Sequence, residues 1–361
     1  MIRPEQPLIE RPISLCLINY NGVQHLERSL GAVRRSRVRF HEVLLVDNAS
    51  TDGSRDLVKY CYPEVQVIPL EQNEGPAGAR NAGFKAARHD LILFVDNDVA
   101  VAPDCAAELR AALTSRSGVL AAMPRVLYTE RRDVIQYEGA DCHFLGHMIP
   151  RLSDMPVSAA PASTTEVSSV ITACFLIDRT AWGTTPPFDS TFIFNYEDHH
   201  FGMRSRLLGH KLLAVSAALC LHGNGTPGLS LRPGGKPAPL RVFCLMRNRW
   251  RIILQCFALR SLVLLAPVLI SFEVFQLLGC IRKGWLGVWL RAVAWMARHP
   301  GITAAGRREV QATRRTPDRA ILQGGDIPFS RSLAQGLLQR AACGSLNRLA
   351  RAYWRLVEGQ L

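Results

Sequence analysis

Short apolar segments alternate with helix-like segments through the first 115 residues. The apolar segments are 13–18, 42–46, 65–68 and 91–95, and the helix-like segments are 23–35, 54–60, 76–88 and 104–115. Each apolar segment is continuous, which is typical of a strand covered on both faces. The order strand, helix, strand, helix therefore predicts an α/β fold with a mostly parallel sheet and helices on both faces.

Polar side chains follow three of these predicted strands, at 19–21, 47–50 and 96–98. In open α/β sheets, ligands bind beyond the carboxyl ends of the strands. Asp96 and Asp98 stand two positions apart, so on an extended segment both would point to one side and could hold one Mg²⁺ or Mn²⁺ ion. The alternative is a turn that caps the following helix.

Two neighbouring segments point to a nucleotide ligand. Asp47 ends a predicted strand, where a carboxylate can accept the imide N–H of uracil or thymine, while Asp52 predicts an N-cap for the next helix. The segment NEGPAGARNAG (73–83) begins with small residues that let the backbone approach a ligand, and Arg80 could contact phosphate oxygens. This segment lacks the G-x-G-x-x-G spacing of dinucleotide-binding turns, so NAD and FAD are not expected; alone, it could also be a tightly packed helix.

The middle of the chain is less regular. Residues 150–169 are rich in Ser, Ala and Pro and predict a loop, whereas 170–179 predict a strand and 197–209 a helix. Residues 223–239 hold five Gly and four Pro, which predicts a lid or a linker. As a lid, this segment would bring Arg232 to a diphosphate.

The basic charge belongs to the last third of the chain. From Arg241 onward there are 19 Lys and Arg against 5 Asp and Glu, a net charge of +14, and the first 240 residues carry −1. This split predicts an anionic partner, either nucleic acid or a lipid surface. We expect membrane contacts from Arg247, Arg249 and Arg251.

The same region contains apolar segments suited to a membrane. Residues 261–281 are interrupted only by Glu273 and Pro267, and their length is near that of a bilayer span, although a flat hairpin in the membrane plane is at least as consistent. Residues 300–330 look polar and loose. Residues 331–358 predict a basic amphipathic helix, with an apolar face that includes Leu337, Leu338, Leu349 and Trp354.

Six ordered motifs resemble family 2 glycosyltransferases of the GT-A fold, and most of all their rhamnosyltransferase-like members. They are CLINYNG, LLVDNASTDGS, NEGPAGARNAG, LFVDNDV, TACFLIDR and FIFNYEDHHFGMRSRLLGHKL, within residues 12–225. The resemblance implies an inverting transferase that uses a nucleotide-activated sugar and a divalent metal. It implies that Asp47 contacts the base, Asp96 the ribose or the metal, and Asp98 the metal. We also expect Asn19, Asn73, Gly75, Arg80 and Arg232 at the nucleotide-sugar site.

The Glu-Asp pair of that family falls on Glu197 and Asp198, where the resemblance implies that the Asp is the general base. A helix N-terminus would keep Asp198 ionised; the alternative is an ordinary first-turn acid or N-cap. His222 matches a family histidine that can complete a metal shell, although a His at the end of an apolar strand can also be structural. His200 and Thr172 depart from the family pattern, and we expect both on the acceptor side.

These observations predict a GT-A domain over 10–235, membrane-associated helices over 236–300 and a basic tail with an amphipathic helix over 301–361. The expected activity is transfer of a sugar from a nucleoside-diphosphate sugar, with dTDP-rhamnose favoured by the resemblance, to a lipid-linked glycan or a cell-envelope polysaccharide. The expected cofactor is Mn²⁺ or Mg²⁺, and no nucleic acid partner is expected.

The expected location is the cytoplasmic face of the cell membrane, as a peripheral or monotopic protein. The ten cysteines include no C-x-x-C pair, which favours reduced thiols over a redox or zinc site. One alternative is a nucleotidyltransferase that makes nucleotide-sugars, for which the glycine-rich basic signature near the N-terminus is missing. The other is a non-catalytic protein that binds membrane or nucleic acid, which would leave the series of Asp residues unexplained.

Overall fold

The first part of the chain follows the predicted alternation of strands and helices. The structure is a computed structural model that describes residues 11–223, 238–327 and 336–361. The elements of this part are β1 (Ile13–Asn19), α1 (Val23–Arg34), β2 (Glu42–Asp47), α2 (Ser54–Cys61), β3 (Gln66–Pro69), α3 (Gly75–Ala86), β4 (Leu91–Asp96), β5 (Val99–Val101) and α4 (Cys105–Ser115). Every element predicted here is present, with bounds that differ by at most two residues.

The next part of the chain, up to residue 222, contributes more strands than helices. The strands are β6 (Val119–Tyr128), β7 (Ile135–Tyr137), β8 (Ala140–His143), β9 (Met148–Pro150), β10 (Thr164–Val167), β11 (Cys174–Asp178) and β12 (Lys211–His222). The helices are α5 (Arg179–Trp182) and α6 (Glu197–Leu207), with 3₁₀ turns η1 (Val157–Ala159) and η2 (Ser190–Phe192). The prediction of a loop over 150–169 is wrong at its end, because the β-branched residues of β10 pair with β12.

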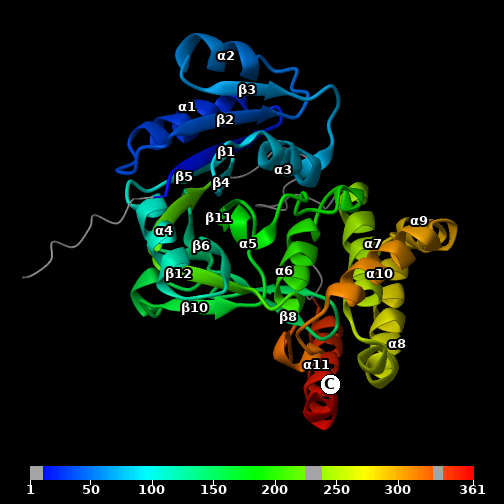
Figure 1. The fold of residues 1–361 in the computed structure, drawn as a ribbon. Helices are drawn as coiled ribbons and strands as arrows, with labels where there is room; N and C mark the ends of the chain where they lie inside the picture. Colours follow the sequence, from blue (N-terminus) through cyan, green and yellow to red (C-terminus); the bar gives the residue numbers. More distant parts are fainter. Residues whose placement is uncertain (1–10, 224–237, 328–335) are drawn as a thin grey trace, which may run out of the picture.

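Within the described residues, ten strands form the main sheet. The candidate site lies where the carboxyl ends of its parallel strands meet. The order along the sheet is β10-β12-β6-β11-β4-β1-β2-β3, with β5 beside β12 and β7 beside β6. The strands β4, β1, β2 and β3 run parallel to one another, whereas β11 runs antiparallel between β4 and β6. Figure 1 shows the parallel half with α1, α2 and α3 around it. The prediction of a mostly parallel sheet is confirmed for the first half, and the second half is mixed.

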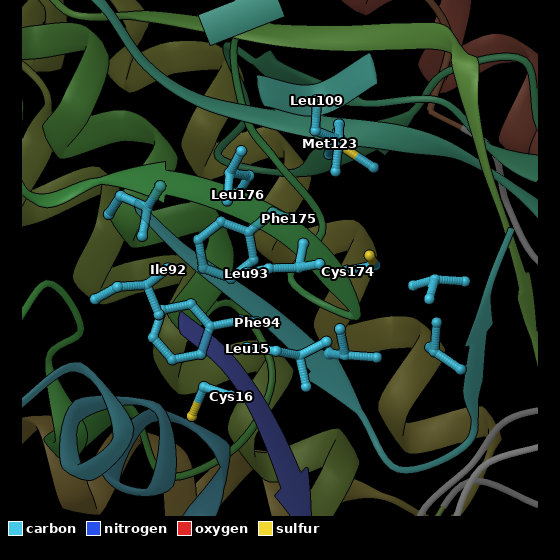
Figure 2. Close-up of a cluster of buried hydrophobic side chains, with 14 of the residues drawn as sticks. Leu15, Cys16, Ile92, Leu93, Phe94, Leu109, Met123, Cys174, Phe175 and Leu176 are labelled. Carbon is cyan, nitrogen blue, oxygen red and sulfur yellow. The ribbon is translucent and has the colours of Figure 1, made fainter. Parts of the chain in front are cut away.

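The core of this sheet is apolar and closely packed. Phe94 of β4 and Phe175 of β11 lie opposite each other in the antiparallel register, and their rings stack with centroids 5.2 Å apart (Figure 2). Helix α3 approaches β1 closely at Gly83, where a Cβ atom would lie 2.1 Å from the Sγ of Cys16. This close packing holds α3 against the sheet and fixes where its N-terminus meets the strand ends.

The C-terminal third is helical and ordered where it is described. Its elements are α7 (Pro239–Cys256), α8 (Leu259–Arg282), α9 (Leu286–Arg298), α10 (Pro300–Thr313), η3 (Asp318–Ala320), β13 (Leu322–Gln323), α11 (Leu337–Val357) and η4 (Glu358–Gln360). Residues 261–281 form one continuous helix, so the predicted hairpin is wrong. The prediction that 300–330 is loose is also wrong over its described residues, because α10 packs on α7 and β13 pairs with β8.

The C-terminal third packs on the first part of the chain through a second apolar core. Strands β13, β8 and β9 form a small sheet, and Phe144 and Leu145 pack in a cluster with residues of α7, α8 and α11. Trp354 stacks on Phe144 with ring centroids 5.0 Å apart. Of the predicted apolar face, Trp354 therefore packs partly buried against this core, whereas Leu337 and Leu349 are exposed.

Candidate active site

The carboxyl ends of β1, β2 and β4 meet at one edge of the main sheet. In the parallel register, Asn19 at the end of β1 lies opposite Asp47 at the end of β2. Ile18 lies opposite Asp96 at the end of β4. The structure thus brings together the polar residues that the sequence places after these strands, at the edge where open α/β sheets bind ligands.

Asp47 is fully enclosed by its neighbours. Asn19 Nδ2 donates to Asp47 Oδ1 at 3.0 Å and the Ser50 N–H donates to Oδ2 at 3.1 Å. Arg55 Nε lies 3.5 Å from the same Oδ2. Asn97 Nδ2 donates to Asn19 Oδ1 at 2.9 Å, which fixes the asparagine in turn. The contact between Asp47 and a base stays a prediction, and it requires the covering residues to move because the Asp47 side chain has 0% exposure.

The N-terminus of α3 is tied to the same edge. Asn48 Nδ2 donates to Asn73 Oδ1 at 2.9 Å and to the Gly75 carbonyl at 3.2 Å. Gly75 has a φ of +71°, and a Cβ atom there would lie 2.2 Å from the carbonyl oxygen of Ile193. Only glycine fits both this conformation and this approach. The predicted roles of Asn73 and Gly75 at the nucleotide-sugar stay predictions.

Arg80 is a buried bridge between two acidic groups. Its Nη2 donates to Asp96 Oδ1 at 2.6 Å and to the Thr172 carbonyl at 3.0 Å. Its Nη1 lies 3.5 Å from Glu197 Oε1. The Arg80 side chain is only 3% exposed and joins Asp96 to the acidic pair. The predicted phosphate contact of Arg80 stays a prediction.

Glu197 and Asp198 begin α6 and are both buried, with exposures of 6% and 9%. The residue that precedes the helix is Tyr196, and the helix has no side-chain cap. Asp198 is therefore not the N-cap, but it does lie in the first turn of the helix, as the alternative of an ordinary first-turn acid requires. Asp198 Oδ1 accepts a hydrogen bond from the His199 N–H at 2.8 Å, which fixes the carboxylate at the start of the helix.

The pair can hold one proton near neutral pH. Burial, together with the charge of Asp198, raises the pKa of Glu197 to about 8. Burial raises the pKa of Asp198 to about 6, against the lowering effect of its hydrogen bond from His199 and of Arg80. Burial thus outweighs the helix N-terminus, which the sequence suggested would keep Asp198 ionised. The two buried carboxyls titrate together above their usual range, and the ionised member of the pair can accept a proton near neutral pH.

Asp98 lies beside His222 and not beside Arg80, the partner of Asp96. His222 ends β12 opposite Val99 of β5, which brings its Nε2 to 3.3 Å from Asp98 Oδ1. Tyr137 OH lies 3.0 Å from His222 Nδ1 and orients the ring. Asp96 thus pairs with Arg80 and Asp98 with His222, and the predicted binding of one cation by Asp96 and Asp98 stays a prediction.

A divalent cation fits this carboxylate–imidazole pair. Within the described ranges, no group of three or more His, Cys, Asp or Glu side chains could hold a metal by itself. Mn²⁺ accepts both oxygen and imidazole ligands, and such ions often complete their shell with substrate phosphates and water. Asp98 and His222 are therefore suited to hold Mn²⁺ jointly with a diphosphate.

Residues 14–179 match the family model described as Glycosyl transferase family 2. The chain contains a family 2 glycosyltransferase domain. An uncharacterized glycosyltransferase of Nostoc sp. is 36% identical over 89 residues, which are 24% of this chain and 28% of that protein. The succinoglycan biosynthesis protein ExoO of Rhizobium meliloti is 36% identical over 93 residues, which are 26% of this chain and 27% of that protein. The matches thus span little more than a quarter of these relatives.

Two solved structures support the fold of the family 2 domain and its extension. GalNAc-T7, solved with UDP, GalNAc and Mn²⁺, has a TM-score of 0.52 at 19% identity and covers 68% of this chain and 48% of that chain. S. aureus TarS 1-349 has a TM-score of 0.50 at 16% identity and covers 96% of this chain and 91% of that chain. The predicted GT-A-type fold with a helical C-terminal region is confirmed, and the rhamnosyltransferase-like subtype is not.

Several predicted residues lie away from an open acceptor side. His200 is buried with 2% exposure and stacks on Phe192 with ring centroids 4.5 Å apart. Thr172 is buried as well and gives its carbonyl to Arg80. The expectation that both residues line the acceptor side is therefore not supported. Arg232 lies outside the described residues.

Sequence reasoning missed residues that the fold brings to the site from distant segments. Tyr137 orients His222 from the short strand β7, which carries no motif. Arg28 of α1 donates to Thr129 Oγ1 at 2.6 Å, and it lies near enough to Asp98 and Arg132 for their charges to affect its pKa, which burial lowers. No local signal marked these residues, because each reaches the site only through the packing of separate elements.

Proposed function

We propose that this protein is an inverting, metal-dependent glycosyltransferase that moves a sugar from a nucleoside-diphosphate sugar to a lipid-linked glycan or a cell-envelope polysaccharide. The observation that carries the proposal is the buried pair of Glu197 and Asp198, joined through Arg80 to Asp96 at the strand edge. Two carboxyl groups with separated pKa values beside a ligand-binding edge are what proton transfer requires.

In the proposed reaction Asp198 removes the proton of the acceptor hydroxyl. The hydroxyl oxygen forms a bond to the anomeric carbon on the face opposite the diphosphate, the bond to the diphosphate oxygen breaks, and the nucleoside diphosphate leaves. This single displacement inverts the anomeric centre. Arg80 keeps Asp96 and Glu197 at fixed separation while the proton moves to Asp198.

Asp98 and His222 are proposed to hold the divalent cation, and Asp96 to contact the ribose or the same cation. A bound cation supplies neutralisation of the diphosphate and of the charge that grows on it as it leaves. GalNAc-T7 was solved with UDP and Mn²⁺, which supports a pyrimidine nucleotide and Mn²⁺ for this chain.

Rates of donor hydrolysis should show which nucleobase the protein accepts and whether it requires a metal. We expect dTDP-rhamnose, UDP-glucose or UDP-galactose to be hydrolysed faster than GDP-mannose, and only with Mn²⁺ or Mg²⁺, because the Asp47 carboxylate pairs with the imide of thymine or uracil. A pocket that tolerates the thymine methyl separates these two bases by only about 1–3 kcal/mol, so cross-reactivity is expected. The measurement is release of nucleoside diphosphate from each donor, with and without metal.

The matched variants are Asp98→Ala and Asp104→Ala. Asp104 lies between β5 and α4, and its half-exposed side chain pairs with Arg37. Asp98→Ala should abolish the metal-dependent rate, and Asp104→Ala should retain it. A clear preference for GDP-mannose would contradict the role of Asp47, and unchanged metal dependence in Asp98→Ala would contradict the metal site.

The proposed location is the surface of an anionic membrane. Among the described helices, α8 is the one long and apolar enough to cross a bilayer, and 17% of its most apolar window is buried. Val263, Ile270, Val274 and Leu278 are each more than half exposed on α8, and Leu290 of α9 is as well. Soluble proteins rarely expose so large an apolar surface without a partner. Arg260, Arg282 and Lys283 stand at the two ends of α8, where they suit anionic headgroups.

The protein should sediment with vesicles of phosphatidylglycerol and phosphatidylcholine at low salt, and Ile270→Glu with Val274→Glu should reduce this binding at least tenfold. Each glutamate places a charge where apolar surface would enter the lipid. The control is Tyr60→Glu, a change at 78% exposure on α2, which lies far from α8 (Figure 1). Failure of the unaltered protein to sediment would rule out the membrane surface.

A further inference from the structure

The segment that leads into the acidic pair has an unfavourable backbone. Ile193, Asn195 and Tyr196 have φ values of 65°, 58° and 66°, a region that residues other than glycine rarely adopt and that is least suited to a β-branched side chain. Around Ile193 the chain makes a three-residue turn in which the Phe194 N–H donates to the Phe192 carbonyl at 2.7 Å. A conformation of this kind persists only where the surrounding structure holds it.

Helix α7 holds this segment by side-chain donors. Asn248 Nδ2 donates to the carbonyls of Phe192 at 2.9 Å, of Phe194 at 3.0 Å and of Asn195 at 2.5 Å. The Phe192 carbonyl also accepts the Phe194 N–H within the turn. Asn248 has 0% exposure, so water does not compete for these hydrogen bonds.

Two arginines of α7 support the same segment. Arg247 Nη2 donates to the Thr191 carbonyl at 3.2 Å and to the Phe192 carbonyl at 2.6 Å. Arg251 Nη2 donates to Asp189 Oδ2 at 2.9 Å. Both arginines have 0% exposure and Arg249 has 1%. The prediction that Arg247, Arg249 and Arg251 meet a membrane is therefore wrong, because their charges are used to bind carbonyls and carboxylates inside the protein.

Helix α3 holds the segment from another direction. Asn81 Nδ2 donates to the Phe188 carbonyl at 2.8 Å, and the Phe188 N–H donates back to Asn81 Oδ1 at 3.1 Å. The Ile193 carbonyl rests against Gly75, where a side chain would collide with it. The strained segment thus lies between the helix at the donor edge and the helix that follows the family 2 domain.

We infer that Asn248 is a positioning residue that sets the place of the general base Asp198 by fixing the carbonyls of 192–195. This inference rests on the proposed function, since it takes Asp198 as the base. Asn248 touches neither reacting atoms nor the Asp198 side chain, so its effect reaches the base through the three backbone units between Asn195 and Asp198. Without Asn248, the strained backbone of the turn relaxes. This relaxation moves the Asp198 carboxylate away from the hydroxyl whose proton it removes.

The test compares Asn248→Leu with Gln311→Leu, because the two amides make the same kind of contact. Gln311 Nε2 donates to the carbonyls of Gln255, Cys256 and Phe257 at 2.9, 3.3 and 3.4 Å, at the C-terminal end of α7. We expect Asn248→Leu to lower kcat for donor hydrolysis at least tenfold with KM for the donor within twofold of the unaltered enzyme. We expect Gln311→Leu to change kcat less than twofold, although both variants lower Tm.

A double variant separates positioning from a general loss of structure. If Asn248 acts through Asp198, then adding Asn248→Leu to Asp198→Asn should cost less than twofold in kcat, because the base is already absent. A full tenfold loss in that background, or equal losses of kcat in Asn248→Leu and Gln311→Leu, would overturn the inference.

If Asn248→Leu does not fold, Asn248→Ser takes its place, because serine keeps one hydrogen-bond donor. It should likewise lower kcat with little change in KM, and it should cost less than twofold in kcat when added to Asp198→Asn. Absence of any donor hydrolysis by the unaltered enzyme with every nucleotide-sugar would instead overturn the proposed function, a result distinct from the failure of Asn248 alone.

Discussion

Asp198→Asn should lower glycosyl transfer by about 10²- to 10⁴-fold, the usual contribution of a positioned general base. The amide keeps the shape of the side chain but cannot accept the acceptor proton. Binding of nucleotide with Mn²⁺ should be unchanged, because Asp98 and His222 are intact. Donor hydrolysis gives the rate, and the rise in Tm on adding nucleoside diphosphate and Mn²⁺ gives the binding.

The pH profile gives this prediction a second readout. Because burial raises the pKa of Asp198 to about 6, the rate of the unaltered enzyme should rise with pH through that value, as protonated Asp198 cannot accept a further proton. The residual rate of Asp198→Asn should lack this rise. Asp104→Asn is the matched change near the start of α4 and should keep both the rate and the profile. Near-normal turnover of Asp198→Asn would contradict the assignment and direct attention to Glu197.

Arg80→Met should destabilise the protein by about 3 kcal/mol. Removing one member of a buried ion pair leaves its partner without compensation, at a typical cost of about 3–5 kcal/mol. The lower end applies here because the Asp96 side chain is still 30% exposed to solvent. Urea denaturation of the full chain, with and without nucleotide, measures the free energy of unfolding.

The control for Arg80→Met is Arg34→Met. Arg34 also makes an ion pair, with Glu64, but the two side chains are 49% and 48% exposed. Exposed pairs contribute little to stability because water and salt screen them, so this change should have little effect on the unfolding midpoint. Equal losses in the two variants would show that Arg80 does not compensate buried charge.

The fold of the first half could be predicted because the residues that determine each strand and helix are neighbours in the sequence. Each strand is a continuous apolar segment followed by a helix, and successive strands of this kind become parallel neighbours. That rule also places Asn19, Asp47 and Asp96 at one edge. The antiparallel insertion of β11 between β4 and β6 could not be predicted, because it depends on pairing between segments about 80 residues apart.

The side-chain partners within the site could not be predicted for a similar reason. Arg80 follows small residues near a helix start, which suggests a phosphate contact, yet its carboxylate partner Glu197 is more than a hundred residues away in the chain. Arg247 looks like membrane charge because the sequence does not reveal the carbonyls of 191–192 to which it donates. Burial, more than residue type, decides the use of a charge.

The bridge through Arg80 sets a limit on recombination between relatives. The family match ends at residue 179, before Glu197 and before α7. A hybrid that joins the matched part of this protein to the later part of a homologue would place another protein's side chain beside Arg80 and another protein's turn beside Gly75. A stable hybrid therefore has to transfer α3, residues 187–198 and α7 together, since these three segments contact one another although they are far apart in the sequence.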